Sequence, residues 1–339
     1  MREIDRLTTE RSGITSLTLM ENAAIAAARC VTELVGNISG KSILIFCGKG
    51  NNGGDGAAAA RLLAIAGARV DVVLIGKVDD TRGDARENFE RLRAWNSHQD
   101  EIGLLNLFEC ESEKGWQQLL ESVLPMPHEA IVDALFGTGL TRPVEGIHRE
   151  AVAYVNRQRA RRDLSPAVVT PIISIDIPSG LDADSEQPIG EAVMADATVT
   201  MTAPKRANVI PPASDYNGRL IVADIGSPAE LIAESESQLL LTTADDARRW
   251  LVKMHAGAGA SLWEAWEVEE APGLCRHGPA AELRSTKFST SDAAAVRPPN
   301  ALNPVCVQKF LGDKLFHKDF RRINLPSLVR AGQCQRPKN

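Results

Sequence analysis

The chain has 339 residues, of which 44% are apolar and 4% aromatic, and its formal net charge is −6. That length can bury a substantial hydrophobic core. The negative charge gives no electrostatic preference for nucleic acid or for an anionic membrane surface. The sequence contains no apolar run of roughly 18 residues that would span a membrane, and its charged start lacks the apolar segment of a signal peptide. We therefore expect a cytoplasmic protein with reduced cysteines and no nucleic-acid or membrane partner.

Helices and strands are predicted to alternate along the first 226 residues. Apolar periodicity predicts helices over 15–34, 57–68, 83–95, 115–124 and 144–159. Short apolar runs predict strands over 41–48, 70–76, 129–139, 171–180, 197–205 and 218–226. This alternation is typical of a Rossmann-like three-layer α/β/α sandwich with a mostly parallel sheet, whose ligands bind beyond the carboxyl ends of the strands.

Residues 47–56, CGKGNNGGDG, contain five glycines in ten positions. We expect this stretch to be neither ordinary helix nor strand, but a loop whose backbone N–H groups form an anion cradle with the next helix. The segment GKGNNG matches GxGxxG, which alone is a weak signal, and no GK[ST] sequence closes a Walker loop. A turn that only reverses the chain does not need adjacent Asn-Asn followed by Gly-Gly-Asp, so we favour a ligand-binding role for this stretch.

Polar side chains follow the other predicted strands. Asp133 ends the third strand, Asp176 and Ser179 follow the fourth, and Lys205 ends the fifth. Because the carboxyl ends of parallel strands share one edge of a sheet, these groups should converge there. With Asn52 they offer oxygen ligands suited to an alkali or alkaline-earth cation rather than to zinc. Singly, each has a structural alternative, since aspartates often cap helices and lone lysines usually lie at the surface.

Five segments occur in order in the sequence: SLTLMENAA, GKGNNGGDGAAAARLL, VDALFGTGL, SIDIPSGLDAD and ADATVTMTAPK. Together they resemble the YjeF N-terminal domain family, the NAD(P)H-hydrate epimerases, over about residues 1–245. The resemblance implies a homodimeric isomerase that interconverts the R and S epimers of hydrated NADH and NADPH. An S-specific dehydratase that uses ADP or ATP then restores the cofactor, so functional coupling to such an enzyme is implied.

The resemblance also implies roles for individual residues. The hydrated dinucleotide would contact Asn51, Asn52, Gly53, Gly54, Asp55 and Asp176, together with a second loop formed by Gly137, Thr138, Gly139, Leu140, Thr141, Arg142 and Pro143. A potassium ion (K+) would be held by Asn52, Asp133 and Ser179. Asp176 and Lys205 are expected to perform the acid/base chemistry, and which group moves the proton stays open.

The sequence changes character near residue 251. Relatives fused to the ADP-dependent dehydratase would continue with a Gly-Lys-rich segment and with Ala-Gly-Met-Ala, both absent here. Codons for CRHG (275–278), shifted by one nucleotide, can spell Ala-Gly-Met-Ala, and those for LWEAWEVEE permit Gly-Lys/Arg pairs. We therefore expect an epimerase domain over 1–245, followed over 246–339 by a poorly structured, out-of-frame remnant of the dehydratase.

Other functions stay open at this point. One is a non-catalytic module that binds a dinucleotide or a protein partner, because a fold does not fix a function. Another is a bifunctional epimerase and ADP-dependent dehydratase, if the C-terminal part folds. A kinase or a dehydrogenase is disfavoured by the missing Walker lysine and by the lack of an acidic residue at the usual ribose position after the second predicted strand.

Overall fold

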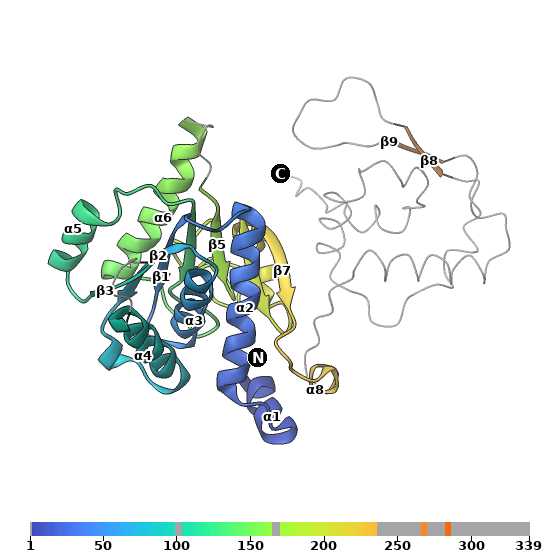
Figure 1. Cartoon of the computed structure of the whole chain (residues 1–339). Helices are drawn as coiled ribbons and strands as arrows, with labels where there is room; N and C mark the ends of the chain where they lie inside the picture. The colour runs from blue at the N-terminus through green and yellow to red at the C-terminus, as the bar shows by residue number, and fades with distance from the viewer. Residues whose placement is uncertain (1, 99–103, 165–169, 236–265, 270–281, 286–339) are drawn as a thin grey trace. The chain divides into compact units, whose positions relative to one another are not determined.

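The structure is a computed structural model that describes residues 2–98, 104–164, 170–235, 266–269 and 282–285 (Figure 1). It contains two compact units, Met1–Ser235 and Glu236–Asn339. In the second unit the described residues are β8 (Trp266–Glu269) and β9 (Glu282–Ser285), which pair antiparallel. The predicted dehydratase remnant, its frameshift and the boundary at residue 245 otherwise lie outside the described residues.

The described residues of the first unit form a seven-stranded parallel sheet in the order β3-β2-β1-β4-β5-β6-β7. The strands are β1 (Ser42–Cys47), β2 (Arg69–Ile75), β3 (Leu105–Cys110), β4 (Ala130–Ala134), β5 (Ile172–Ile175), β6 (Ala197–Met201) and β7 (Arg219–Ala223). The chain runs outward from β1 to β3, returns to place β4 beside β1, and then runs outward to β7. The order therefore reverses between β1 and β4, the position at which doubly wound folds bind their ligands.

Helices cover both faces of this sheet (Figure 1). They are α1 (Arg2–Ser12), α2 (Ser16–Val35), α3 (Asn51–Ile65), α4 (Gly83–His98), α5 (Glu113–Ser122), α6 (Gly146–Leu164), α7 (Arg206–Val209) and α8 (Ala229–Ala233), with 3-10 turns η1 (Val78–Asp80) and η2 (Ala213–Tyr216). Helices α2, α3 and α4 share one buried cluster with the sheet, and α5 and α6 share the other. Among the residues that the structure describes, no helix combines the length and apolar character needed to span a bilayer.

Strand β1 shows why the sequence folds in three layers. Ile43 and Ile45 belong to the cluster beneath α2, α3 and α4, whereas Leu44 and Phe46 belong to the cluster beneath α5 and α6. Successive side chains of a strand point to opposite faces, so a strand covered on both faces needs an apolar residue at every position. The burial of β1 on both faces therefore explains the continuous apolar run in its sequence.

Several elements lie where the sequence predicted none, namely α1, β3, α7, α8, β8, β9 and the turns η1 and η2, and the first two matter most for the fold. Strand β3 is an edge strand in which buried and exposed positions mix, and it carries the polar residues Asn106 and Glu109, so its apolar run is interrupted. Helix α1 buries Ile4 and Thr8 within an otherwise charged segment. The predicted strands over 129–139 and 171–180 are also shorter, because their glycine- and proline-containing ends are loops.

The prediction that residues 47–56 form neither helix nor strand was wrong for the second half of that stretch. Helix α3 begins at Asn51 and includes three of the five glycines. Glycine lowers helix propensity, but close packing overrides that preference here. A Cβ on Gly53 would overlap the carbonyl oxygen of Gly48, so only glycine lets the helix approach the end of β1 this closely.

Three aromatic rings fill the layer beneath α5 and α6. The ring centroid of Phe46 lies 6.1 Å from that of Trp116 and 5.8 Å from that of Tyr154. The Tyr154 hydroxyl donates a hydrogen bond of 2.7 Å to the Leu124 carbonyl oxygen, and burial raises the pKa of Tyr154 to about 12. The hydroxyl therefore stays protonated and can keep its buried acceptor satisfied.

Replacing Phe46 by Ala should lower the free energy of unfolding by about 3–5 kcal/mol, because a fully buried ring is lost and a cavity remains. Leu34→Ala serves as the control, since Leu34 on α2 is 38% exposed and should change stability by less than about 1 kcal/mol. Urea unfolding followed by circular dichroism measures both. Equal effects of the two substitutions would contradict the position of Phe46 in the core.

Candidate active site

A cavity of about 780 Å³ opens beyond the carboxyl ends of β1, β4, β5 and β6. Its walls come from the loops after these strands and from α1, α2, α3, α4 and α6. The cavity lies at the reversal of strand order, and its volume suits a small molecule or cofactor. A second cavity of about 240 Å³, lined by residues such as Leu124, His128 and Tyr154, lies near the start of β4 and away from these groups.

Asp176 and Lys205 form an ion pair in the larger cavity. The Lys205 Nζ lies 2.6 Å from Asp176 Oδ1, and the side chains are only 6% and 14% exposed. Lys205 Nζ also donates to Thr200 Oγ1 at 2.8 Å and to the Met201 carbonyl oxygen at 3.0 Å. Two of the three ammonium N–H donors are used by these hydrogen bonds, and the contact with Asp176 Oδ1 is an ion pair without hydrogen-bond geometry. Asp176 Oδ2 accepts from the Thr138 backbone N–H at 3.0 Å, which fixes the carboxylate as well.

The backbone is strained where β5 and β6 end. Asp176 has a φ of 69° and Thr202 a φ of 64°, the left-handed region that residues with a Cβ rarely adopt. Both residues line the cavity, and the Asp176 N–H is held by the Val199 carbonyl oxygen at 2.7 Å. Such strain costs on the order of 1–3 kcal/mol and clusters at functional sites. The left-handed backbone at both strand ends is therefore consistent with a functional site.

A buried polar network lies beneath the cavity floor. Asp133 in β4 is fully buried, and its Oδ1 accepts from Ser179 Oγ at 2.5 Å and from the Leu135 N–H at 3.3 Å. Its Oδ2 accepts from Ser174 Oγ and from the Ser179 N–H, both at 2.8 Å. Ser179 Oγ in turn accepts from the Phe136 N–H at 2.9 Å. Burial raises the pKa of Asp133 although these hydrogen bonds oppose the rise.

Asn52 presents a buried amide without a partner. It lies in the first turn of α3 and is 8% exposed, and neither its Oδ1 nor its Nδ2 has a hydrogen-bond partner among the described residues. A Cβ on Gly137 would lie 2.6 Å from Asp176 Oδ2 and 3.3 Å from Asn52 Oδ1, so this glycine brings its loop against both side chains. An unsatisfied buried amide costs about 1–3 kcal/mol, which points to a ligand or ion as its partner.

Asp55 brings a second carboxyl group to the cavity. Burial raises the pKa of Asp55 well above its usual range, and the charges of Asp176 and Asp5 raise it further, while Lys205 opposes the rise. The raised pKa favours the protonated form of this carboxyl group relative to that of a solvent-exposed aspartate. The cavity therefore places an ion-paired aspartate near a second carboxyl group of higher proton affinity, a combination suited to acid/base chemistry.

Three basic residues line part of the cavity. Lys49, Arg142 and His148 all reach it. The His148 ring lies 4.8 Å from the Phe136 ring, and burial, with the nearby charge of Lys49, lowers the pKa of His148. His148 is therefore neutral at pH 7, which leaves Lys49 and Arg142 as the cations available to a phosphate group.

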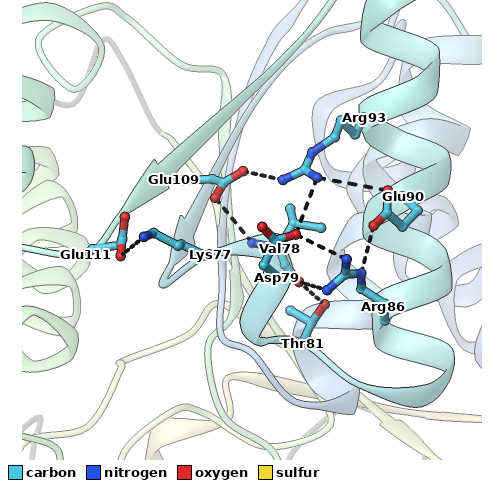
Figure 2. A network of polar contacts seen from close by, with 9 residues as sticks. All are labelled: Lys77, Val78, Asp79, Thr81, Arg86, Glu90, Arg93, Glu109 and Glu111. Atoms are coloured by element: carbon cyan, nitrogen blue, oxygen red, sulfur yellow. Dashed lines mark hydrogen bonds and ion pairs between the residues drawn. The ribbon is translucent and has the colours of Figure 1, made fainter.

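A polar network joins η1, the short turn after β2, to α4 and β3 (Figure 2). Lys49 Nζ lies 3.5 Å from Asp80 Oδ2 in η1. Glu109 anchors that turn by accepting from the Val78 N–H at 3.3 Å and from Arg93 Nη2 at 2.7 Å, as the dashed lines in Figure 2 show. The turn therefore holds the Asp80 carboxylate that pairs with Lys49, a residue of the cavity wall.

The structure brings most of the predicted binding residues to this one cavity. It is lined by Asn51, Asn52, Asp55, Gly137, Thr138, Gly139, Leu140, Arg142, Pro143 and Asp176. Gly53 and Gly54 are buried in helix packing instead, Thr141 is not among the lining residues, and the predicted ion ligands Asp133 and Ser179 lie beneath the floor.

Sequence reasoning missed Asp5, Lys49 and His148. Lys49 stands inside the glycine-rich stretch and comes directly after a predicted strand, which is a usable signal. Asp5 and His148 lie on helices, where a polar residue carries no such signal until the packing is known.

Comparison with known proteins gives consistent matches. The family described as YjeF-related protein N-terminus matches residues 16–207. The chain is 36% identical over 276 residues to the bifunctional NAD(P)H-hydrate repair enzyme Nnr of Moorella thermoacetica, covering 81% of this chain and 48% of that one. It is 33% identical over 224 residues to the NAD(P)H-hydrate epimerase of Limosilactobacillus fermentum, covering 66% of this chain and 93% of that one.

The fold also matches a solved structure. The crystal structure of the yeast protein YNL200c aligns with a TM-score of 0.50 at 24% identity and covers 70% of this chain and 93% of that one. This likeness supports the fold. The chain spans about half the length of the Moorella bifunctional relative, at 48%.

Gly53→Ala should lower the free energy of unfolding by about 3 kcal/mol, because the new methyl group would overlap the Gly48 backbone and force α3 outward. Gly50→Ala, at the N-cap of the same helix, is the matched control, since nothing lies within 4 Å of its added Cβ. Thermal unfolding of both variants checks this. A Gly53→Ala protein as stable as Gly50→Ala would contradict the close approach of α3 to β1.

Proposed function

Because the chain belongs to the YjeF-related N-terminal family, we propose that it is an isomerase that interconverts the R and S epimers of hydrated NADH and NADPH. The observation that carries this proposal is the Asp176–Lys205 ion pair, 2.6 Å long, inside the cavity of about 780 Å³. A relative named for the epimerase activity alone is matched over 93% of its length, which supports an isomerase rather than a dehydratase.

The substrate's chemistry sets what the site must do. Hydration of a dihydronicotinamide adds water across a ring double bond and leaves the hydroxyl on a carbon bonded to the ring nitrogen. Inversion at that carbon requires proton transfer to and from the hydroxyl oxygen. Asp176 would face this carbon. Its carboxylate would be held in position by the Thr138 N–H and by the ion pair with Lys205.

The rest of the dinucleotide would use the glycine-rich helix start. The N-terminus of α3 presents backbone N–H groups and a positive dipole end, which favour a pyrophosphate. Lys49 and Arg142 line the same cavity and add charge-assisted hydrogen bonds to phosphate oxygens. Asn51 and the 137–143 loop complete this wall.

We further propose that a potassium ion binds at the cavity floor, held by Asn52, Asp133 and Ser179. Asn52 Oδ1, buried without a hydrogen-bond partner, supports this site. Asp133 forms no ion pair among the described residues, and the ion would share its oxygens with the four hydrogen bonds that they already accept. The described residues contain no cluster of three or more His, Cys, Asp or Glu side chains that would hold a transition metal. When bound, the ion supplies a fixed positive charge beneath the substrate.

Functional coupling to an ADP- or ATP-dependent dehydratase is part of the proposal, and the name of the bifunctional Moorella relative supports it. A homodimer and a cytoplasmic location stay predictions. The alternative of a non-catalytic binding module is disfavoured by the intact Asp176–Lys205 pair, since a scaffold has no need to bury charges in a cavity.

Purified protein, mixed with the R epimer of hydrated NADH, an external S-specific dehydratase and ATP, should restore NADH absorbance faster than the same mixture without the protein. Asp176→Asn should slow this recovery by about 10²–10⁴-fold, the usual contribution of an acid/base group. Asp184→Asn, on an exposed position of the same loop, is the control and should match the wild type. No acceleration by a wild-type protein that still binds the hydrate would favour the binding module.

Potassium chloride should raise the thermal unfolding midpoint relative to an equal concentration of tetramethylammonium chloride, because an ion that binds the folded state stabilises it by mass action. Asn52→Ala should abolish this difference. Asn51→Ala, at the exposed neighbouring position, should retain it. Identical midpoints of the wild type in the two salts would contradict the ion site.

A further inference from the structure

Helix α1 brings a carboxyl group to the cavity from outside the matched family segment. The family match begins at residue 16, whereas α1 spans Arg2–Ser12 and packs against α2 and α8 (Figure 1). Asp5 of this helix lines the cavity. The site therefore includes a residue that none of the matched motifs contains.

The two faces of α1 differ in a way that singles out Asp5. The outer face carries Arg6, which bonds to Glu3 and Glu10 in an exposed ion-pair ladder. The inner face buries Ile4 and Thr8. Asp5 is adjacent to Ile4 and partly buried with it, so an acidic residue occupies the side of the helix that contacts the protein.

The Asp5 carboxyl group has no structural partner to explain it. Within the described part of the chain, no hydrogen bond or ion pair engages its side-chain oxygens, unlike those of Glu3 and Glu10 on the same helix. Burial raises the pKa of Asp5, and the charge of Asp176 adds to the rise, while the chain's amino group and Lys205 oppose it. A partly buried carboxyl that makes no contact of its own is available to a ligand.

The carboxyl groups of Asp5, Asp55 and Asp176 share the cavity with one buried ammonium, and this imbalance suggests what the Asp5 carboxyl group does. Asp5, Asp55 and Asp176 interact electrostatically with one another and with Lys205. Lys205 contacts Asp176 at 2.6 Å, so the single buried ammonium is committed to that carboxylate. Asp5 and Asp55 line the same cavity, and within the described part of the chain no ion pair engages either carboxyl group. Burial raises the pKa of both, which favours their protonated form relative to that of a solvent-exposed aspartate. An ionised carboxylate opposite a protonated one is the usual division between base and acid.

We propose that Asp5 is a further catalytic residue, the acid that protonates the leaving hydroxyl group of the hydrated nicotinamide. This assignment rests on the epimerase function proposed above. The Asp5 proton passes to the hydroxyl oxygen as the carbon–oxygen bond breaks, the ring nitrogen's lone pair forms a double bond to that carbon, and water leaves. Water then adds to the opposite face and gives one proton to the Asp176 carboxylate. Proton exchange with solvent returns Asp176 and Asp5 to their starting states, so the epimer forms without any other reactant.

Three variants of α1 test the assignment in the coupled assay. Asp5→Asn should lower kcat by roughly 10²-fold while KM changes by less than about threefold, because the acid is lost but the cavity keeps its shape. Asp5→Glu retains a carboxyl group and should restore kcat to within about tenfold of the wild type. Glu10→Gln removes an acidic group from the outer face of the same helix and should leave kcat unchanged.

The pH profile separates an acid from a structural residue. In the wild type, kcat should fall as pH rises through the pKa of the acid, because only the protonated carboxyl donates. Asp5→Asn should lack this decline. Unchanged turnover in Asp5→Asn, or a loss that accompanies a lower thermal midpoint with the pH profile retained, would overturn the assignment. A wild-type protein that does not epimerise at all would overturn the proposed function and this inference with it.

Discussion

The cost of burying a charge governs the arrangement of this site. Lys205 and Asp176 are nearly enclosed, and an unpaired charge in that environment would be strongly destabilising. Each partner is therefore given further contacts: two oxygens of β6 for the ammonium and the Thr138 N–H for the carboxylate. Because these groups come from the ends of β4, β5 and β6, the ion pair joins three strand ends to one another.

Close packing around glycines is the second constraint, and it encloses the polar groups of the site. Glycines allow α3 to lie against the end of β1 and the 137–143 loop to lie against Asn52 and Asp176. The same approach encloses the amide of Asn52 and the carboxyl of Asp55, so their polar groups face the cavity in a low-dielectric setting. The composition of the glycine-rich stretch is thus explained by packing as much as by ligand contact.

Sequence reasoning predicted the features that depend on hydrophobic period and on position along the chain. Strands buried on both faces, such as β1, carry continuous apolar runs, and site residues such as Asp176 come directly after them. It did not predict β3, because an edge strand with polar residues lacks that run. The helical start at Asn51 and the position of Asp5 at the cavity were also missed, since tertiary packing overrides the local propensity of glycine and decides which face of a polar helix is enclosed.

The contact between α1 and α8 has a consequence for the timing of assembly. These helices lie at opposite ends of the first unit's sequence, and Arg11 Nη1 reaches Glu234 Oε2 at 2.9 Å. During synthesis, α1 leaves the ribosome first and α8 only after the whole sheet has been made. A nascent chain can therefore contain Asp176 and Lys205 in their strands' final order before Asp5 has the support that places it at the cavity. Within this unit, a segment translated before the sheet thus depends on one translated after it for its place at the site.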